Sequence, residues 1–166
     1  MDEIEVSEKQ ITTDSQAFRD AMAAAKKVLD ASPDNRQERD IDELCPLKEW
    51  FADGIYMREI FMPKGTIIMG KIHKYEHPNF VMQGEVVSQT PEGEKVIKAP
   101  CFFISKPGTQ RLLLIKEDTI WITAHKNFDN LKDRDLLEEF HVVRTFEEYD
   151  QFKQLETSPK KELVNL

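Results

Sequence analysis

The chain has 166 residues, of which 40% are hydrophobic and 33% charged, and its formal net charge at pH 7 is −8. This length is sufficient for one domain with its own hydrophobic core. The apolar runs are too short for a membrane-spanning helix, the acidic start predicts no signal peptide, and the net acidity argues against nucleic acid as a partner. Two cysteines, Cys45 and Cys101, do not make a disulfide framework and are typical of a reducing compartment.

The charge is divided unevenly along the chain. Residues 1–45 carry a net charge of −6, residues 46–126 a net charge of +2, and residues 127–166 a net charge of −4. One interpretation is that exposed helices and tails carry solvated charge. The other is that two acidic flanks are docking segments around a nearly neutral centre. We expect these boundaries to separate an N-terminal helix and linker, a β-barrel, and a C-terminal helical extension with a tail.

The first predicted element is a helix over residues 16–30, where apolar side chains recur with helical spacing. Asp14 or Ser15 is suited to cap its N-terminus, and Pro33 ends it before a polar linker over residues 34–45. This helix is expected either to pack on its own barrel or to form an interface with another subunit, and the two alternatives have equal weight. The apolar stripe consists of Phe18, Met22, Ala25 and Leu29.

Short runs of strand-forming residues follow between residues 56 and 125. Turn sequences separate them, such as Pro-Lys-Gly at 63–65 and Lys-Pro-Gly at 106–108. So many short strands with such turns indicate an antiparallel sandwich or barrel. Helical texture returns after residue 127, where Thr145 and Glu148 have the spacing of a capping box. The last ten residues are expected to be loose.

The strand segment resembles the cupins, a family of small jelly-roll barrels. The first cupin motif contains two histidines separated by one residue, then a glutamate, between two glycines. The stretch over residues 65–84 matches this pattern with Lys71 and His73 at the histidine positions and His77 at the glutamate position. The second motif resembles residues 106–111, with Arg111 at its histidine position. The resemblance implies a mainly β, cupin-type antiparallel barrel over residues 46–126.

The departures from the motif fall on the positions that bind metal in cupins. A complete cupin site offers three histidines and a carboxylate, which suits iron, manganese, nickel or zinc. Here a lysine and an arginine take two of those places, and their charges oppose a divalent ion. We therefore expect no cofactor. The alternative is a divalent metal on His73 and His77 with His125 as a third ligand, while His141 is interpreted as incidental.

Arg111 and Lys71 are candidate ligand-binding residues. The planar guanidinium of Arg111 could hold a carboxylate or phosphate from inside the barrel. The alternative, slightly favoured, is that it forms an internal ion pair. The candidate partners for that pair are Glu59, Glu76 and Glu85. Lys71 follows the same reasoning, with simple exposure as its stronger alternative.

Residues 99–125 are similar to a cupin subgroup encoded by tailed bacteriophages, in which Pro-Gly-Thr, one further residue and Arg precede a strand ending near Trp and His. The resemblance implies a structural component of the virion or tail, made in the host cytoplasm. The preferred function is a non-catalytic assembly or binding protein with protein partners, as a homo-oligomer or larger assembly. The alternative is a metal-binding cupin enzyme or small-molecule sensor that uses His73 and His77.

Overall fold

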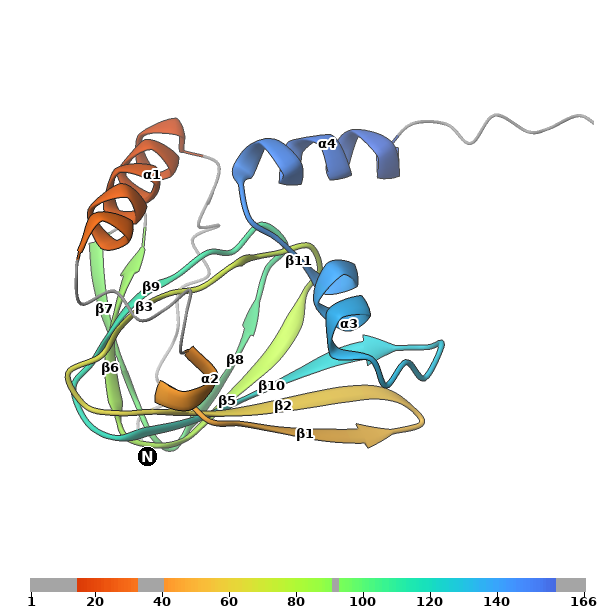
Figure 1. Ribbon diagram of the computed structural model, residues 1–166, viewed down its shortest axis with the longest axis horizontal. Helices are drawn as coiled ribbons and strands as arrows, with labels where there is room; N and C mark the ends of the chain where they lie inside the picture. The colour runs from red at the N-terminus through yellow and green to blue at the C-terminus, as the bar shows by residue number, and fades with distance from the viewer. Residues whose placement is uncertain (1–14, 33–40, 91–92, 158–166) are drawn as a thin grey trace, which may run out of the picture.

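The computed structural model describes residues 15–32, 41–90 and 93–157 (Figure 1). Helices α1 (Gln16–Ala31) and α2 (Ile41–Leu44) come first, and helices α3 (Arg134–His141) and α4 (Phe146–Thr157) come last. The strands are β1 (Leu47–Ala52), β2 (Gly54–Met62), β3 (Ile67–Met69), β4 (Ile72–His73), β5 (His77–Gln83), β6 (Glu85–Thr90), β7 (Gly93–Lys98), β8 (Cys101–Ser105), β9 (Leu112–Ile115), β10 (Thr119–Asn127) and β11 (Val142–Val143). Within these ranges no helix is long and apolar enough to cross a membrane.

The strands form two main antiparallel sheets. The five-stranded sheet has the order β1-β2-β10-β5-β8, and the four-stranded sheet has the order β3-β9-β6-β7. The chain passes repeatedly from one sheet to the other between β2 and β10, so that β10 pairs with both β2 and β5. Such crossing between two sheets is the topology of a jelly roll. The predicted fold class, a mainly β antiparallel jelly roll with an N-terminal helix and a C-terminal helical extension, is confirmed.

The hydrophobic core lies between the two sheets. Val81 and Trp121 from the five-stranded sheet belong to one cluster with Val86 and Ile115 from the four-stranded sheet, and all four are at most 5% exposed. Cys45 is completely buried in the same cluster, and burial raises the pKa of its thiol. This cysteine therefore acts as a small hydrophobic side chain.

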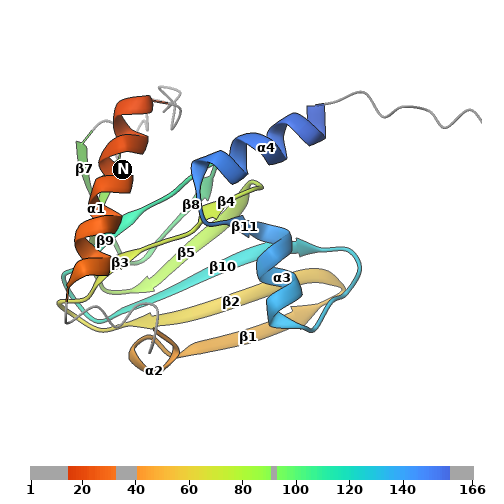
Figure 2. The same ribbon diagram turned by 45° about the horizontal axis from the view of Figure 1, so that its top comes forward.

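The C-terminal extension is joined to the barrel by a short two-stranded ladder. Strand β11 pairs antiparallel with β4, which places Val142 opposite His73. The predicted capping box at the start of α4 is confirmed, because the Glu148 backbone N–H donates to Thr145 Oγ1 at 3.2 Å and the Glu148 carboxylate accepts from the Thr145 N–H at 3.4 Å. Figure 2 shows α3 and α4 on the same side of the five-stranded sheet as α1. The predicted loose end falls almost entirely outside the described residues.

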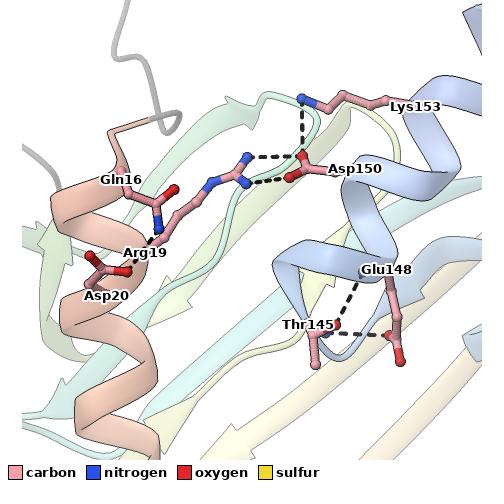
Figure 3. A network of polar contacts seen from close by, with 7 residues as sticks. All are labelled: Gln16, Arg19, Asp20, Thr145, Glu148, Asp150 and Lys153. Atoms are coloured by element: carbon pink, nitrogen blue, oxygen red, sulfur yellow. Dashed lines mark hydrogen bonds and ion pairs between the residues drawn. The ribbon is translucent and has the colours of Figure 1, made fainter.

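Helix α1 is capped by Ser15 and tied to α4. The Ser15 hydroxyl accepts from the Phe18 N–H at 3.4 Å, which fulfils one of the two predicted caps. The Arg19 guanidinium donates to both carboxylate oxygens of Asp150, at 2.7 and 3.2 Å (Figure 3). It also lies 4.6 Å from the centre of the Phe146 ring. The two helices are therefore held together through one arginine.

The apolar stripe of α1 is turned partly toward its own barrel. Met22 is only 3% exposed, while Phe18, Ala25 and Leu29 are half-buried. An open groove of about 440 Å³ lies between α1 and the start of α4, and its lining includes Met22 and Ile72. The predicted linker over residues 34–45 lies largely outside the described residues, although residues 41–44 form α2.

Candidate ligand site

Four histidines from four different elements form one cluster at the end of the barrel. His73 lies on β4, His77 begins β5, His125 lies on β10 and His141 ends α3. The ring centroids of His73 and His77 are 4.1 Å apart, those of His77 and His125 4.8 Å, and those of His125 and His141 4.7 Å. The centroids of His73 and His125 are 5.7 Å apart. The structure thus brings together His73, His77 and His125, the three histidines predicted from the sequence as candidate metal ligands.

The backbone around His73 is held by the Pro-Gly turn of the second motif. The His73 N–H donates to the Thr109 carbonyl at 3.2 Å, and the Gly108 N–H donates to the His73 carbonyl at 2.7 Å. Gly108 has a φ of +79°, a conformation that L side chains rarely adopt. A Cβ atom at this position would also lie 2.8 Å from the Tyr149 ring. The turn therefore needs glycine, and it links the histidine cluster to α4.

His141, interpreted from the sequence as incidental, lies inside the histidine cluster. Its side chain is 4% exposed and lies against His125, because the β11–β4 ladder folds the end of α3 back onto the barrel. The Lys74 N–H donates to the His141 carbonyl at 2.8 Å and fixes the backbone there. No local spacing relates His141 to the other three histidines. Only the tertiary pairing of two two-residue strands brings it to the cluster.

The imidazoles of the cluster are neutral at pH 7. Burial is the main cause that lowers the pKa of each ring below its usual 6.5, and it holds the pKa of His73 well below that value. The pKa of His141 falls to about 4 and that of His125 to about 2. The neighbouring imidazoles and Arg58 lower the pKa of His125 further, because positive charges close together repel. Each neutral ring retains one nitrogen lone pair.

Several ring nitrogens of the cluster are buried without a hydrogen-bond partner among the described residues. They are Nδ1 of His73 and Nε2 of both His77 and His141. Nδ1 of His77 lies 3.2 Å from the Tyr75 carbonyl, which can only accept, so this nitrogen carries the proton and Nε2 carries the lone pair. A buried lone pair that lacks a donor is costly and calls for a ligand, an ion or a water molecule.

Arg111 lies beside this cluster, and the ion pair expected for it is not formed. Glu59 is paired with Lys48 at 3.0 Å, and the other two candidate partners are also engaged by lysines. Those pairs are Glu76 with Lys106 at 2.9 Å and Glu85 with Lys98 at 3.2 Å. Exposed lysines reach these carboxylates because all three point out of the barrel. The expectation of an internal ion pair is therefore corrected.

The guanidinium of Arg111 instead lies 5.1 Å from the centre of the Phe103 ring. Burial lowers the pKa of Arg111 to about 10, so the group is still cationic at pH 7. Its charge lowers the pKa of both His73 and His77. Within the described part of the chain, no carboxylate is paired with Arg111. A partly buried cation without a counter-ion favours an anionic ligand.

Lys71 lies at the rim of the barrel and faces α3. Its ammonium is paired with the Glu138 carboxylate, and its side chain is 42% exposed. This pair connects the strand region to α3 close to the end that carries His141. In this arrangement Lys71 holds the extension in place.

The four histidines are of a type that binds metal ions, but their rings are not arranged around a common centre. Neutral imidazole is a common ligand for zinc, copper, iron and nickel. Among the described residues, however, no three His, Cys, Asp or Glu side chains are so arranged that they could hold a metal ion. The donor set fits a transition metal by chemical type, charge state and unsatisfied lone pairs, provided that the rings turn toward a common centre.

No family model and no curated protein matches the chain. Among solved structures, it is similar to a cupin domain from Bordetella pertussis Tohama I, at 12% identity over 50% of this chain and 93% of that chain, with a TM-score of 0.41. It is similar to an acetylacetone dioxygenase from Acinetobacter johnsonii, at 13% identity over 48% and 58% of the two chains, with a TM-score of 0.42. A cupin domain of an XRE family transcriptional regulator from Enterobacter cloacae gives 9% identity over 49% and 94%, with a TM-score of 0.42. The assignment to a mainly β jelly roll rests on the sheet topology described above.

Proposed function

We propose that this chain is a binding protein whose barrel holds a divalent transition metal ion on His73, His77, His125 and His141. The observation that carries the proposal is the gathering of four neutral imidazoles within 4.1–5.7 Å of their neighbours. Hydrophobic packing alone does not favour four polar rings at one place, three of which carry a buried nitrogen without a partner among the described residues. A bound ion would supply a Lewis-acidic centre and would take up the unpaired lone pairs.

We further propose that the site also takes an anionic ligand, held by Arg111. The histidines bring no negative charge, and Arg58 and Arg111 both lower histidine pKa values by their positive charge. A divalent ion adds to this excess, so a carboxylate or phosphate next to Arg111 would offset it. The planar guanidinium can donate two parallel hydrogen bonds to such a group. Lys71, at the rim of the barrel, could bind the same anion only if its ion pair with Glu138 were broken.

The metal proposal is tested by elemental analysis of full-length protein purified without a histidine tag. We expect about one equivalent of iron, nickel, manganese or zinc, and its loss in the His77→Ala variant. Cys101→Ser is the matched control, since it removes a possible metal ligand outside the cluster and should keep the ion. Protein that remains metal-free after incubation with each of these ions would contradict the proposal.

The second candidate is a non-catalytic assembly role in a phage particle. It is supported by the resemblance of residues 99–125 to a phage-encoded subgroup and by nonpolar side chains exposed on the outside of the five-stranded sheet. This role predicts that the chain co-sediments with purified particles in stoichiometric amounts. Its absence from such particles would remove this candidate and leave the metal proposal untouched.

A further inference from the structure

The outer face of the five-stranded sheet is nonpolar across all five strands. Side chains alternate between the two faces of a strand. The register places Trp50 opposite Met57, and it places Phe80 opposite both Phe102 and Ile122. All five side chains point away from the core, since the residues next to them in sequence point inward. The sheet thus has a hydrophobic inner face, which forms the core, and a second hydrophobic face outside.

Several side chains on this outer face are strongly exposed. Phe102 is 79% exposed, Met82 57%, Trp50 54%, Ile104 50% and Ile55 44%. Figure 1 shows α1, α3 and α4 on the other side of the sheet, so none of these three helices covers these residues. We call this surface the outer sheet face.

The outer sheet face carries little net charge. Lys48 and Glu59 lie opposite each other on it and form an ion pair at 3.0 Å, so their charges cancel. The outer sheet face therefore has no strong charge that could complement a strongly charged partner. It is complementary to another nonpolar surface, and a second copy of this chain has such a surface.

The area of the outer sheet face is close to the area that a small dimer interface buries on each partner. Strands about 4.8 Å apart that rise about 3.3 Å per residue give five strands of this length a footprint of roughly 500–600 Å². Exposed apolar patches on monomers rarely exceed about 300–600 Å². Specific interfaces bury about 600–1,000 Å² per partner. The flat footprint lies just below that range, and side chains that stand out from it, such as Phe102 and Trp50, add accessible surface that an interface would bury.

We infer that two copies of this chain associate through their outer sheet faces, sheet against sheet about a twofold axis. A twofold interface uses the same patch on both subunits, so one self-complementary nonpolar face is sufficient. Two sheets pack face to face at about 10 Å, with their side chains interdigitated. The exposed Phe102 and Met82 would then become buried between the sheets. This inference rests on the proposed assembly role and adds the surface through which the chain would assemble. The two are tested separately, since co-sedimentation with particles tests the assembly role and self-association of the purified chain tests the outer sheet face.

The experiment is sedimentation equilibrium of the full-length chain over a range of about 1–100 μM, where specific dimers of ordinary affinity form. We expect a dimer whose dissociation constant rises at least about 30-fold in Phe102→Glu, because a buried unpaired carboxylate opposes association. Met82→Glu is the second variant and should act in the same direction. Both residues are exposed, so circular dichroism should show an unchanged fold.

Val28→Glu is the matched control, since Val28 is 72% exposed but lies on α1, away from the outer sheet face. It should leave the dimer unchanged. The inference is overturned if the wild-type chain is monomeric at about 100 μM, which includes the case in which another part of the same chain covers the face. It is also overturned if both glutamate variants dimerise as the wild type does. Metal content is not affected in either case, because the histidines lie on the opposite face of the sheet.

Discussion

The indole N–H of Trp121 donates to Oδ1 of Asn79 at 3.0 Å in the buried layer below the histidine cluster. Asn79 is 2% exposed and Trp121 5%, so neither group has water as an alternative partner. The Asn79 amide in turn donates to Ser105 Oγ at 2.8 Å. This polar chain joins β10, β5 and β8 at the level where His77 and His125 emerge from the same sheet.

Trp121→Phe should destabilise the protein by about 1–3 kcal/mol, because it leaves Asn79 Oδ1 buried without a donor. Urea unfolding followed by circular dichroism measures the change. Gln89→Ala serves as the control, since the Gln89 side chain donates to Glu94 at an exposed position and its loss should cost no more than about 0.5 kcal/mol. Equal effects of the two substitutions would show that the buried hydrogen bond contributes nothing.

The stability of the metal-free protein should fall as the pH drops below about 6.5. The folded pKa values of His125 and His141 are about 2 and about 4, so the unfolded chain takes up protons in this range while the folded chain does not. Each such histidine costs about 1.4 kcal/mol per pH unit until the pH reaches its folded pKa. Above pH 6.5 both states are neutral and the effect vanishes.

Denaturant unfolding at pH 7, 6 and 5 measures this slope. The His125→Gln variant should reduce it by about one proton, because it removes one histidine that stays neutral when folded. A slope that is the same in wild type and variant would mean that His125 takes up its proton in the folded state near the usual pH.

Gly108→Ala should be more destabilising than Gly93→Ala. Both glycines have positive φ, +79° at Gly108 and +111° at Gly93, so an L side chain strains the backbone at either position. Only at Gly108 would the new Cβ meet the Tyr149 ring, at 2.8 Å, whereas nothing described lies within 4 Å at Gly93. We expect a difference of about 1–3 kcal/mol from this overpacking. Urea unfolding of both variants checks it, and equal losses would show that Tyr149 simply moves aside.

Inorganic phosphate or malonate should stabilise the wild-type chain through Arg111. At about 10 mM of either probe we expect the Tm to rise by about 2–4 °C, because a ligand that binds only the folded state shifts the unfolding equilibrium. Arg111→Gln should lose this shift, and Lys71→Gln should retain it, since Lys71 is engaged by Glu138. A shift that survives in Arg111→Gln would place the anion elsewhere.

The fold and part of the site follow from local patterns, and the remainder depends on tertiary pairing. Alternation and turn residues identified most strands and the motif that carries His73 and His77. The edge strand β1 was not predicted, because Lys48 and Glu49 interrupt its apolar pattern. Lys48 pairs with Glu59 on the neighbouring strand β2, and Glu49 pairs with Arg134 on α3. Long-range partners of this kind leave no trace in a local pattern.

The ion pairs of the charged residues could not be predicted from the sequence either. The motif spacing identifies which charged residues occupy the motif positions, but not which residues they pair with. The partners are chosen by which face of a strand each side chain occupies, as when Glu85 on β6 pairs with Lys98 on the adjacent β7. The carboxylates predicted as partners of Arg111 are therefore paired with lysines in the structure. His141 was missed because nothing in the sequence shows that the end of α3 returns to the barrel.

The pairing of β11 with β4 has a consequence for how this protein can be divided. The fourth histidine and the partner of Lys71 both belong to the C-terminal extension, so a chain that stops at residue 126 would lack part of the proposed site. The C-terminal extension therefore completes the proposed binding site, because it brings His141 to the other three histidines. A substitution that weakens the β11–β4 pairing, even far from the histidines, should therefore weaken ligand binding at the proposed site without unfolding the two main sheets.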